Sequence, residues 1–100
     1  MYHKLSVVLR LSAQRALWGA IPTSLRAVSV DIDDRKIYYR CVFDASDTEE
    51  ARELLSVAAA EVIADFSAPY TIEEEYLSVA YPNKMQHLKH LVFLRYEPET

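Results

Sequence analysis

The fold is decided by the segment LRAVSVDIDDRKIYYRCVFD, which occupies residues 25–44. A two-residue turn at Asp34-Arg35 would pair the apolar positions on either side of it, and the alternation of a β-strand would place them on one face. That face would carry Val28, Val30, Ile32, Ile37, Tyr39, Cys41 and Phe43. In this register Arg26 would lie opposite Phe43. The other face would carry Ser29, Asp31, Asp33, Lys36, Tyr38 and Arg40. We therefore predict a β-hairpin with one buried face and one face in water.

A helix is predicted before the hairpin, over residues 5–20, because its apolar residues recur with a helical period. It should end before Pro22, since the residue that precedes a proline disfavours helical backbone. Its inward positions are Leu5, Leu9, Ala13, Ala16, Leu17 and Ala20. A second apolar strip lies roughly opposite and consists of Val7, Leu11 and Trp18. A surface helix needs only one such stripe. The second strip therefore predicts contact with a flanking loop, a target protein or a second copy in a homodimer.

A second helix is expected to begin at Ser46, where Ser46-Asp47-Thr48-Glu49 matches a capping box, and to end near Phe66. Its inward positions are Ala51, Leu55, Ala58, Val62 and Phe66. Its outward face is acidic and carries Glu49, Glu50, Glu53 and Glu61.

Two further strands are predicted over residues 71–81 and 88–96. The last strand is apolar on both faces at residues 91–94, which is typical of a strand inside a sheet. We predict a single α+β domain over residues 1–100, with the order αββαββ. Its four-stranded, mostly antiparallel sheet would have both helices on one face.

The sequence lacks the residues that several kinds of catalytic, nucleotide-binding and metal site require. Gly19 is the only glycine, whereas nucleotide-binding loops and nucleophile elbows need several. The single thiol, Cys41, is expected to be a small buried side chain. His87 and His90 are too few for a zinc site. We therefore predict no catalytic residue, no metal and no cofactor. The N-terminal residues resemble no signal peptide, so a cytoplasmic location is expected.

The net charge of -4 opposes the binding of nucleic acid, which needs an excess of cations, and suits a basic protein partner. Carboxylates beside tyrosines make a good protein-binding surface, although acidic faces also simply keep proteins soluble. The candidate residues are Asp31, Asp33, Asp34, Tyr38, Glu49, Glu50, Glu53, Glu61, Glu73, Glu74, Glu75 and Tyr76. The alternative is an enzyme or small-molecule sensor with a pocket between helix and sheet, and with Glu74 or Tyr76 at its mouth.

Three stretches carry a family resemblance: RALWGAIP (residues 15–22), EVIADF (61–66) and IEEEYL (72–77). They resemble small bacterial proteins that include the immunity proteins of polymorphic toxin systems, contact-dependent growth inhibition among them. The resemblance covers residues 14–97. It implies a cytosolic protein that binds a cognate toxin domain and blocks the active site of that toxin or its access to substrate. Many such toxins are basic nucleases. Immunity proteins have no catalytic motif, so the resemblance assigns no catalytic residue.

Overall fold

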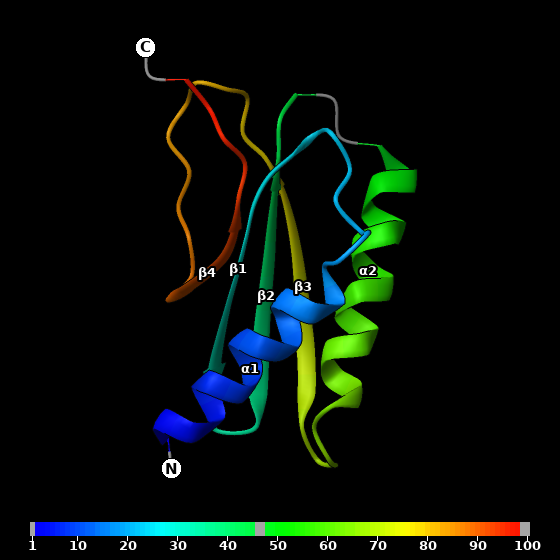
Figure 1. Cartoon of the computed structure of the whole chain (residues 1–100), viewed down its shortest axis with the longest axis vertical. Coiled ribbons are helices and arrows are strands. Elements are labelled where there is room, and N and C mark those ends of the chain that lie inside the picture. Colours follow the sequence, from blue (N-terminus) through cyan, green and yellow to red (C-terminus); the bar gives the residue numbers. More distant parts are fainter. Residues whose placement is uncertain (1, 46–47, 99–100) are drawn as a thin grey trace.

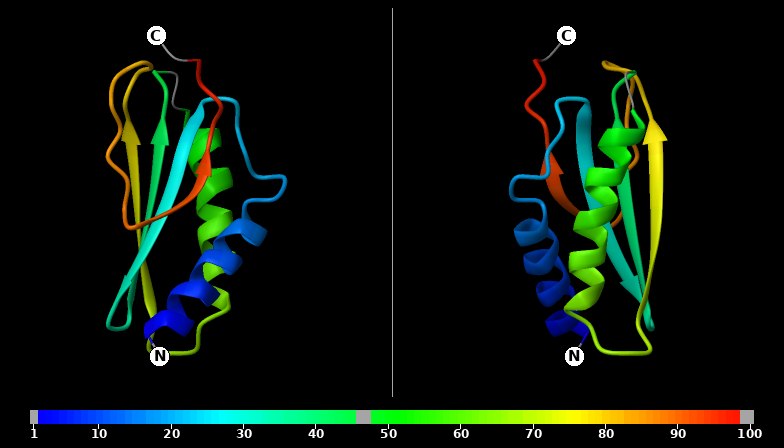
Figure 2. Two further views of the ribbon diagram at one scale, coloured as in Figure 1. Left: turned by 60° about the vertical axis from the view of Figure 1, so that its left-hand side comes forward. Right: turned by 90° about the vertical axis from the view of Figure 1, so that its right-hand side faces the viewer.

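A computed structural model describes residues 2–45 and 48–98. The elements are α1 (Tyr2–Ala16), β1 (Leu25–Asp33), β2 (Lys36–Phe43), α2 (Glu49–Ala64), β3 (Thr71–Ser78) and β4 (His90–Leu94). The strands form one sheet in the order β3-β2-β1-β4 (Figure 1). β1 pairs antiparallel with β2 and β4, whereas β2 and β3 are parallel and are joined by the crossover helix α2. Both helices cover the same face of the sheet (Figure 2). The predicted α+β fold and its element order are confirmed.

The hairpin of β1 and β2 has the predicted register over most of its length. Ile32 pairs with Ile37 and Val30 pairs with Tyr39 on either side of the turn. Asp34 has a φ of 59° in that turn, a conformation that aspartate tolerates better than most residues. The seven apolar side chains predicted for one face are all buried in the core. Burial raises the pKa of the Cys41 thiol to about 12, so the thiol is protonated and unreactive at neutral pH.

The predicted pairing of Arg26 with Phe43 is wrong, because β1 contains a bulge at this point. Leu25 pairs with Phe43 instead, and the register shifts between Leu25 and Ala27. A bulge adds one residue to a strand and redirects the side chains around it. Leu25 consequently joins the core, whereas the Arg26 guanidinium donates to the carbonyl oxygens of Val79 (2.8 Å) and Asn83 (3.0 Å).

The second face of the hairpin is not open to water along its whole length, contrary to the prediction. Residues 79–89 lie over part of it, on the side of the sheet away from the helices (Figure 2). Ser29 is only 1% exposed, and its hydroxyl oxygen accepts a hydrogen bond from the Leu88 N–H (2.8 Å). Arg40 donates to the carbonyl oxygen of Gln86 (3.0 Å) from the same face. The segment supplies backbone partners for these polar side chains, so they need no contact with water.

The predicted helix ends are displaced: α1 begins at Tyr2, before the predicted start at Leu5, and ends before Ala20, whereas α2 is shorter than predicted at both ends. α1 ends at Ala16, and the chain leaves it through Gly19, whose φ of 75° favours glycine. α2 begins at Glu49 rather than at Ser46. Its N-cap is Thr48, whose hydroxyl oxygen accepts from the Ala51 N–H (3.1 Å). Ser46 and Asp47 lie outside the described residues. At its other end α2 stops at Ala64, with Asp65 as its C-cap.

The last strand, β4, lies at an edge of the sheet and not inside it as predicted. Its residues Val92 and Phe93 pack against the core, whereas Leu91 and Leu94 are 42% and 54% exposed. An apolar run on both faces is therefore compatible with a short edge strand that keeps one face exposed.

Charged side chains fasten the segment after β4 to the rest of the chain. The Arg26 guanidinium donates to both carboxylate oxygens of Glu97, at 2.7 and 2.9 Å. Arg95 bridges Glu97 (2.9 Å) and Asp44 (3.0 Å). The hydrogen bond with Arg26 holds the pKa of Glu97 below its ordinary value. These ion pairs join residues from β1, the end of β2 and the C-terminal segment.

Asp44 gives a testable dependence of stability on pH. Its carboxylate accepts from the backbone N–H groups of Tyr81 (2.9 Å) and Ala45 (2.8 Å), and it also pairs with Arg95. The hydrogen bond from Tyr81, helped by Arg95, lowers the pKa of Asp44 from 3.8 to about 2. Because this pKa is lower in the folded chain, the charged carboxylate stabilises the fold at neutral pH. That contribution is lost as the pH falls through the folded-state pKa.

We expect Asp44→Asn to melt at a lower temperature than the wild type at neutral pH. The difference should shrink between about pH 5 and about pH 2, as the wild-type carboxyl group becomes protonated. Thermal melts followed by circular dichroism across this range would measure it. Glu97 is unchanged in both proteins, so the comparison isolates Asp44. A difference that stays constant over the range would contradict the assignment.

Candidate functional site: an acidic helix beside an apolar groove

A groove of about 540 Å³ separates α2 from the segment that enters β1. We call it the α2 groove, and its lining consists of Pro22, Thr23, Ser24, Thr48, Glu50, Ala51, Glu53, Leu54 and Val57. Two large apolar side chains are open to solvent in it, Leu54 at 40% and Val57 at 56% exposed. Glu50 and Glu53 lie beside them and are exposed. The groove therefore combines an apolar surface with negative charge.

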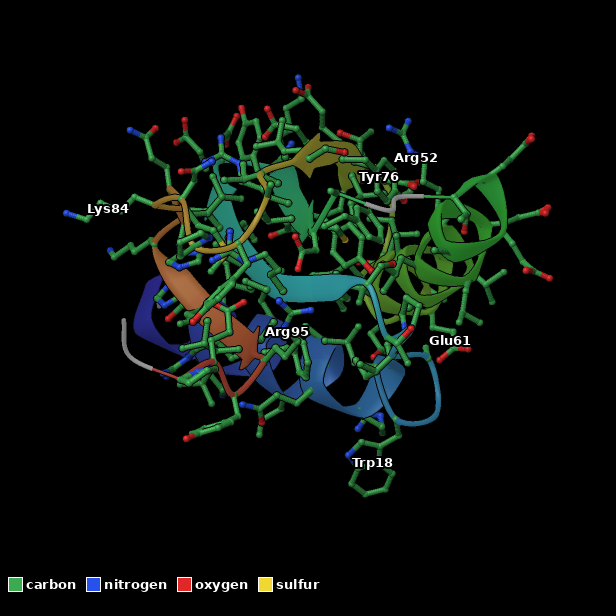
Figure 3. All side chains as sticks on the ribbon, turned by 90° about the horizontal axis from the view of Figure 1, so that it is seen from above. Trp18, Arg52, Glu61, Tyr76, Lys84 and Arg95 are labelled. Carbon is green, nitrogen blue, oxygen red and sulfur yellow. The ribbon has the colours of Figure 1, made fainter. Side chains whose placement is uncertain are left out.

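Helical spacing explains why these side chains share one flank of α2. The adjacent flank is the core face, where Ala51, Leu55, Ala58, Ala59 and Val62 are buried. Residues separated by three, four or seven positions lie above one another on a helix. Glu50, Leu54, Val57 and Glu61 follow that spacing and form a stripe beside the core face. In Figure 3, Glu61 lies on the same side of α2 as Trp18, whereas Arg52 lies on the opposite flank next to Tyr76.

The carboxylates of α2 carry unpaired charge. Glu49, Glu50, Glu53 and Glu61 are all exposed, as the sequence predicted. Over residues 2–45 and 48–98, none of the four forms an ion pair. Glu49 and Glu50 also lie in the first turn, where negative charge stabilises a helix. This helix thus presents negative charge that no cation of the described chain neutralises.

The acidic residues of the sheet behave differently, because two of them already have partners. Glu73 pairs with Lys36 (3.0 Å) and Glu75 pairs with Arg40 (2.8 Å) across the parallel pairing of β2 and β3. Lys36 also lies 5.7 Å from the centre of the Tyr38 ring. Asp31, Asp33 and Tyr38 line a shallow groove together with Lys89, and Asp34 is exposed in the adjoining turn. This face carries mixed charge and is not a purely acidic surface.

Glu74 and Tyr76 form a third group, on the helix side of the edge strand β3. The Tyr76 hydroxyl donates to Glu74, and its ring stacks against Phe43 at 6.3 Å. The Arg52 guanidinium lies 5.8 Å from the centre of the same ring. Burial raises the pKa of Tyr76 above its ordinary value. The ring is thus packed against its neighbours at the position predicted for a pocket mouth. Four surface grooves of the described chain are each lined by other side chains.

The predicted binding residues consequently fall into three separate groups: the α2 carboxylates, the mixed-charge sheet face and the Glu74-Tyr76 pair. Leu54, Pro22, Thr23 and Ser24 line the α2 groove but were not among the residues predicted from the sequence to bind a partner. The sequence does contain one indication of this surface, because Leu54 and Val57 are large apolar residues between outward glutamates. No pattern in the sequence placed residues 22–24 opposite them.

The second apolar strip predicted for the first helix is exposed, although Trp18 lies in the turn after α1 and not in the helix itself. Val7 is 40%, Leu11 57% and Trp18 83% exposed, and Trp18 extends away from the sheet (Figure 3). The part of this chain that the structure describes leaves the strip uncovered. Contact of the strip with a second copy stays a prediction.

No described helix combines the length and the apolar character needed to cross a bilayer. Within the same residues, no three histidine, cysteine, aspartate or glutamate side chains are grouped so that they could hold a metal ion.

Comparison with known families places the chain in a class of toxin-neutralising proteins. Residues 6–97 match the family model described as MafI2 immunity protein. The match spans most of the sequence, and the chain belongs to this family of immunity proteins. The predicted resemblance to bacterial immunity proteins is confirmed. The toxin system of the matched family is related to contact-dependent growth inhibition but distinct from it. No match was found among curated proteins.

Proposed function

We propose that this immunity protein neutralises a cognate toxin domain by binding to it, and that it covers the active site of the toxin or blocks access of its substrate. Membership of the immunity protein family supports the proposal. The observation that carries it is the row of unpaired carboxylates on α2 beside exposed apolar side chains. Apolar contacts supply binding energy, and unpaired carboxylates capture arginine and lysine side chains. The role is one of binding and not of catalysis.

The charge of the chain favours a basic toxin, and a nuclease is the enzyme class that fits best. A nuclease domain needs cationic residues to hold phosphates. The net charge of -4 and the α2 carboxylates complement such a surface. Complementary potentials accelerate association and fix orientation. Because a nuclease would act on nucleic acid inside the cell, the immunity protein would protect from the cytoplasm.

We expect a toxin reading frame next to this gene, and co-expression with the toxin domain that it encodes tests the proposal. Cells that produce the toxin domain alone should stop growing, and cells that also produce the immunity protein should grow normally. The purified pair should form a stable complex on size-exclusion chromatography, and addition of the immunity protein should abolish cleavage of nucleic acid by the toxin. Absence of both protection and a complex would refute the proposed function. Protection and a complex with a toxin that cleaves no nucleic acid would refute only the nuclease assignment.

The homodimer predicted from the α1 strip has its own test. If Trp18 joined two copies, the mass of the wild type in solution would be twice that of Trp18→Glu, because a charge cannot be buried unpaired in an apolar contact. Multi-angle light scattering measures both masses. A monomeric mass for both proteins would exclude this dimer.

A further inference from the structure

We infer that the toxin binds in the α2 groove, through a segment that places apolar side chains on Leu54 and Val57 and basic side chains next to the surrounding glutamates. This inference rests on the proposed function and adds to it the surface and the chemistry of the bound segment. It selects one of the three groups of acidic residues and leaves the others outside the interface.

The arrangement of side chains along α2 specifies the pattern that the toxin segment must have. Glu50 and Glu61 mark the two ends of a stripe whose central positions are Leu54 and Val57. Eleven helical steps separate the two glutamates, a rise of about 16 Å along the helix axis. An extended segment covers that length with about five residues. The complementary pattern is therefore basic at both ends and apolar between them. Glu53, on the outward side of the groove lining, offers a further contact for a basic residue.

The mixed-charge sheet face fits a basic partner less well than the α2 groove does. Glu73 and Glu75 are already paired with Lys36 and Arg40, so a toxin cation would have to displace an existing partner. The α2 carboxylates have no cation to displace within the described part of the chain. A basic side chain of the toxin would therefore meet no competing cation of the described chain at the α2 carboxylates.

The apolar strip of α1 does not have the charge that a basic partner needs. The residues that flank the strip on the surface of α1 include Lys4 and Arg10, both of which are exposed. Like charges facing each other across an interface oppose binding. Unlike the sheet face and the α1 strip, the α2 groove combines exposed apolar side chains with carboxylates that form no ion pair within the described residues.

Two double variants separate the two kinds of contact. Glu50→Gln/Glu53→Gln removes charge and keeps side-chain size, whereas Leu54→Gln/Val57→Gln removes apolar contact and keeps charge. Charged groups at an interface act mainly on association and on its salt dependence. Truncation of apolar anchors acts mainly on dissociation. The matched control is Glu73→Gln/Glu75→Gln, which changes the net charge by the same amount on the sheet face.

The binding experiment uses the cognate toxin domain identified by the co-expression test, immobilised and presented with each immunity protein at two salt concentrations. Each groove variant should raise Kd by about tenfold or more. The glutamate variant should do so through slower association with a weaker salt dependence, and the apolar variant through faster dissociation. The control variant should stay within about twofold of the wild type. Thermal melts would verify that every variant is folded at the temperature of the measurement.

Wild-type affinity in both groove variants would overturn the inference and leave the proposed function standing. An equal loss in the control and in the glutamate variant would also overturn it, because overall charge and not the groove would then govern binding. Failure of the wild type itself to bind the toxin would refute the proposed function together with this inference.

Discussion

Replacement of Glu97 by alanine is expected to lower the free energy of unfolding by about 3 kcal/mol. The side chain of Arg26 is only 3% exposed, and Glu97 is the carboxylate that pairs with it. Without Glu97, the guanidinium would retain two carbonyl partners and the more distant charge of Asp44, but no carboxylate bonded to it. Removal of one member of a buried ion pair leaves the other charge uncompensated, which costs more than loss of the pair as a whole. Urea unfolding followed by circular dichroism measures the difference.

The control for this prediction is an ion pair of similar length on the surface. Lys36 and Glu73 are 3.0 Å apart, but their side chains are 48% and 57% exposed. Glu73→Ala should therefore cost less than about 1 kcal/mol, because water and salt screen exposed pairs. If Glu97→Ala cost no more than Glu73→Ala, the Arg26 network would not stabilise the fold in the way its burial indicates.

Replacement of Leu55 by alanine is expected to destabilise the fold by about 3 kcal/mol. Leu55 is fully buried between α2 and the sheet. Its own carbonyl oxygen accepts a hydrogen bond from the buried Tyr39 hydroxyl (2.8 Å), which holds the helix against β2 at this point. The side chain cannot be shortened without leaving a cavity that rigid neighbours fill only partly. A fall in the melting temperature, measured by differential scanning calorimetry, would report the loss.

The adjacent Leu54 offers a control in the same helix with the same change of residue. It is 40% exposed, so Leu54→Ala should cost less than about 1 kcal/mol. Helix propensity changes equally in both variants and cannot account for a difference between them. Equal destabilisation by the two substitutions would contradict the described orientation of α2. Under the docking model, Leu54→Ala should instead weaken binding of the toxin.

The hairpin could be predicted from sequence because its information is local. Alternation of apolar residues fixes which face is buried, and the pairing of Ile32 with Ile37 follows from a two-residue turn. The bulge at Arg26 could not be predicted in this way. Its partners Val79, Asn83 and Glu97 are 53 to 71 residues away in the sequence. A register change sustained by such distant groups has no signature in the strand itself.

The predicted helix ends were wrong for a different reason. The sequence contains residues that mark the true ends, but other patterns in the same segments favoured different positions. Gly19 was treated only as a count of glycines, although a single glycine after a helical pattern marks its end. Thr48 is the observed cap, but the match of residues 46–49 to a capping box favoured an earlier start at Ser46.

The sequence predicted the charged residues of the candidate site but not the groove beside them. The outward direction of the α2 glutamates follows from helical periodicity. The groove depends on where residues 22–24 pass α2, and that path is set by the tertiary packing of α1 and β1. The acidic residues are distributed among three surfaces because of the order of the strands in the sheet. The periodicity of apolar residues in the sequence does not specify that order.

The residues of α2 fall into two sets, one that packs in the core and one that faces solvent. Ala51, Leu55, Ala58 and Val62 hold the helix in place, whereas Glu50, Glu53, Leu54, Val57 and Glu61 add little to the core. Substitutions that touch no buried contact usually change stability by a small amount. The outward set can therefore be exchanged almost freely while the scaffold stays intact. A chain of this architecture could acquire a new cognate partner through a handful of changes along one helix, without any rearrangement of the sheet that supports it.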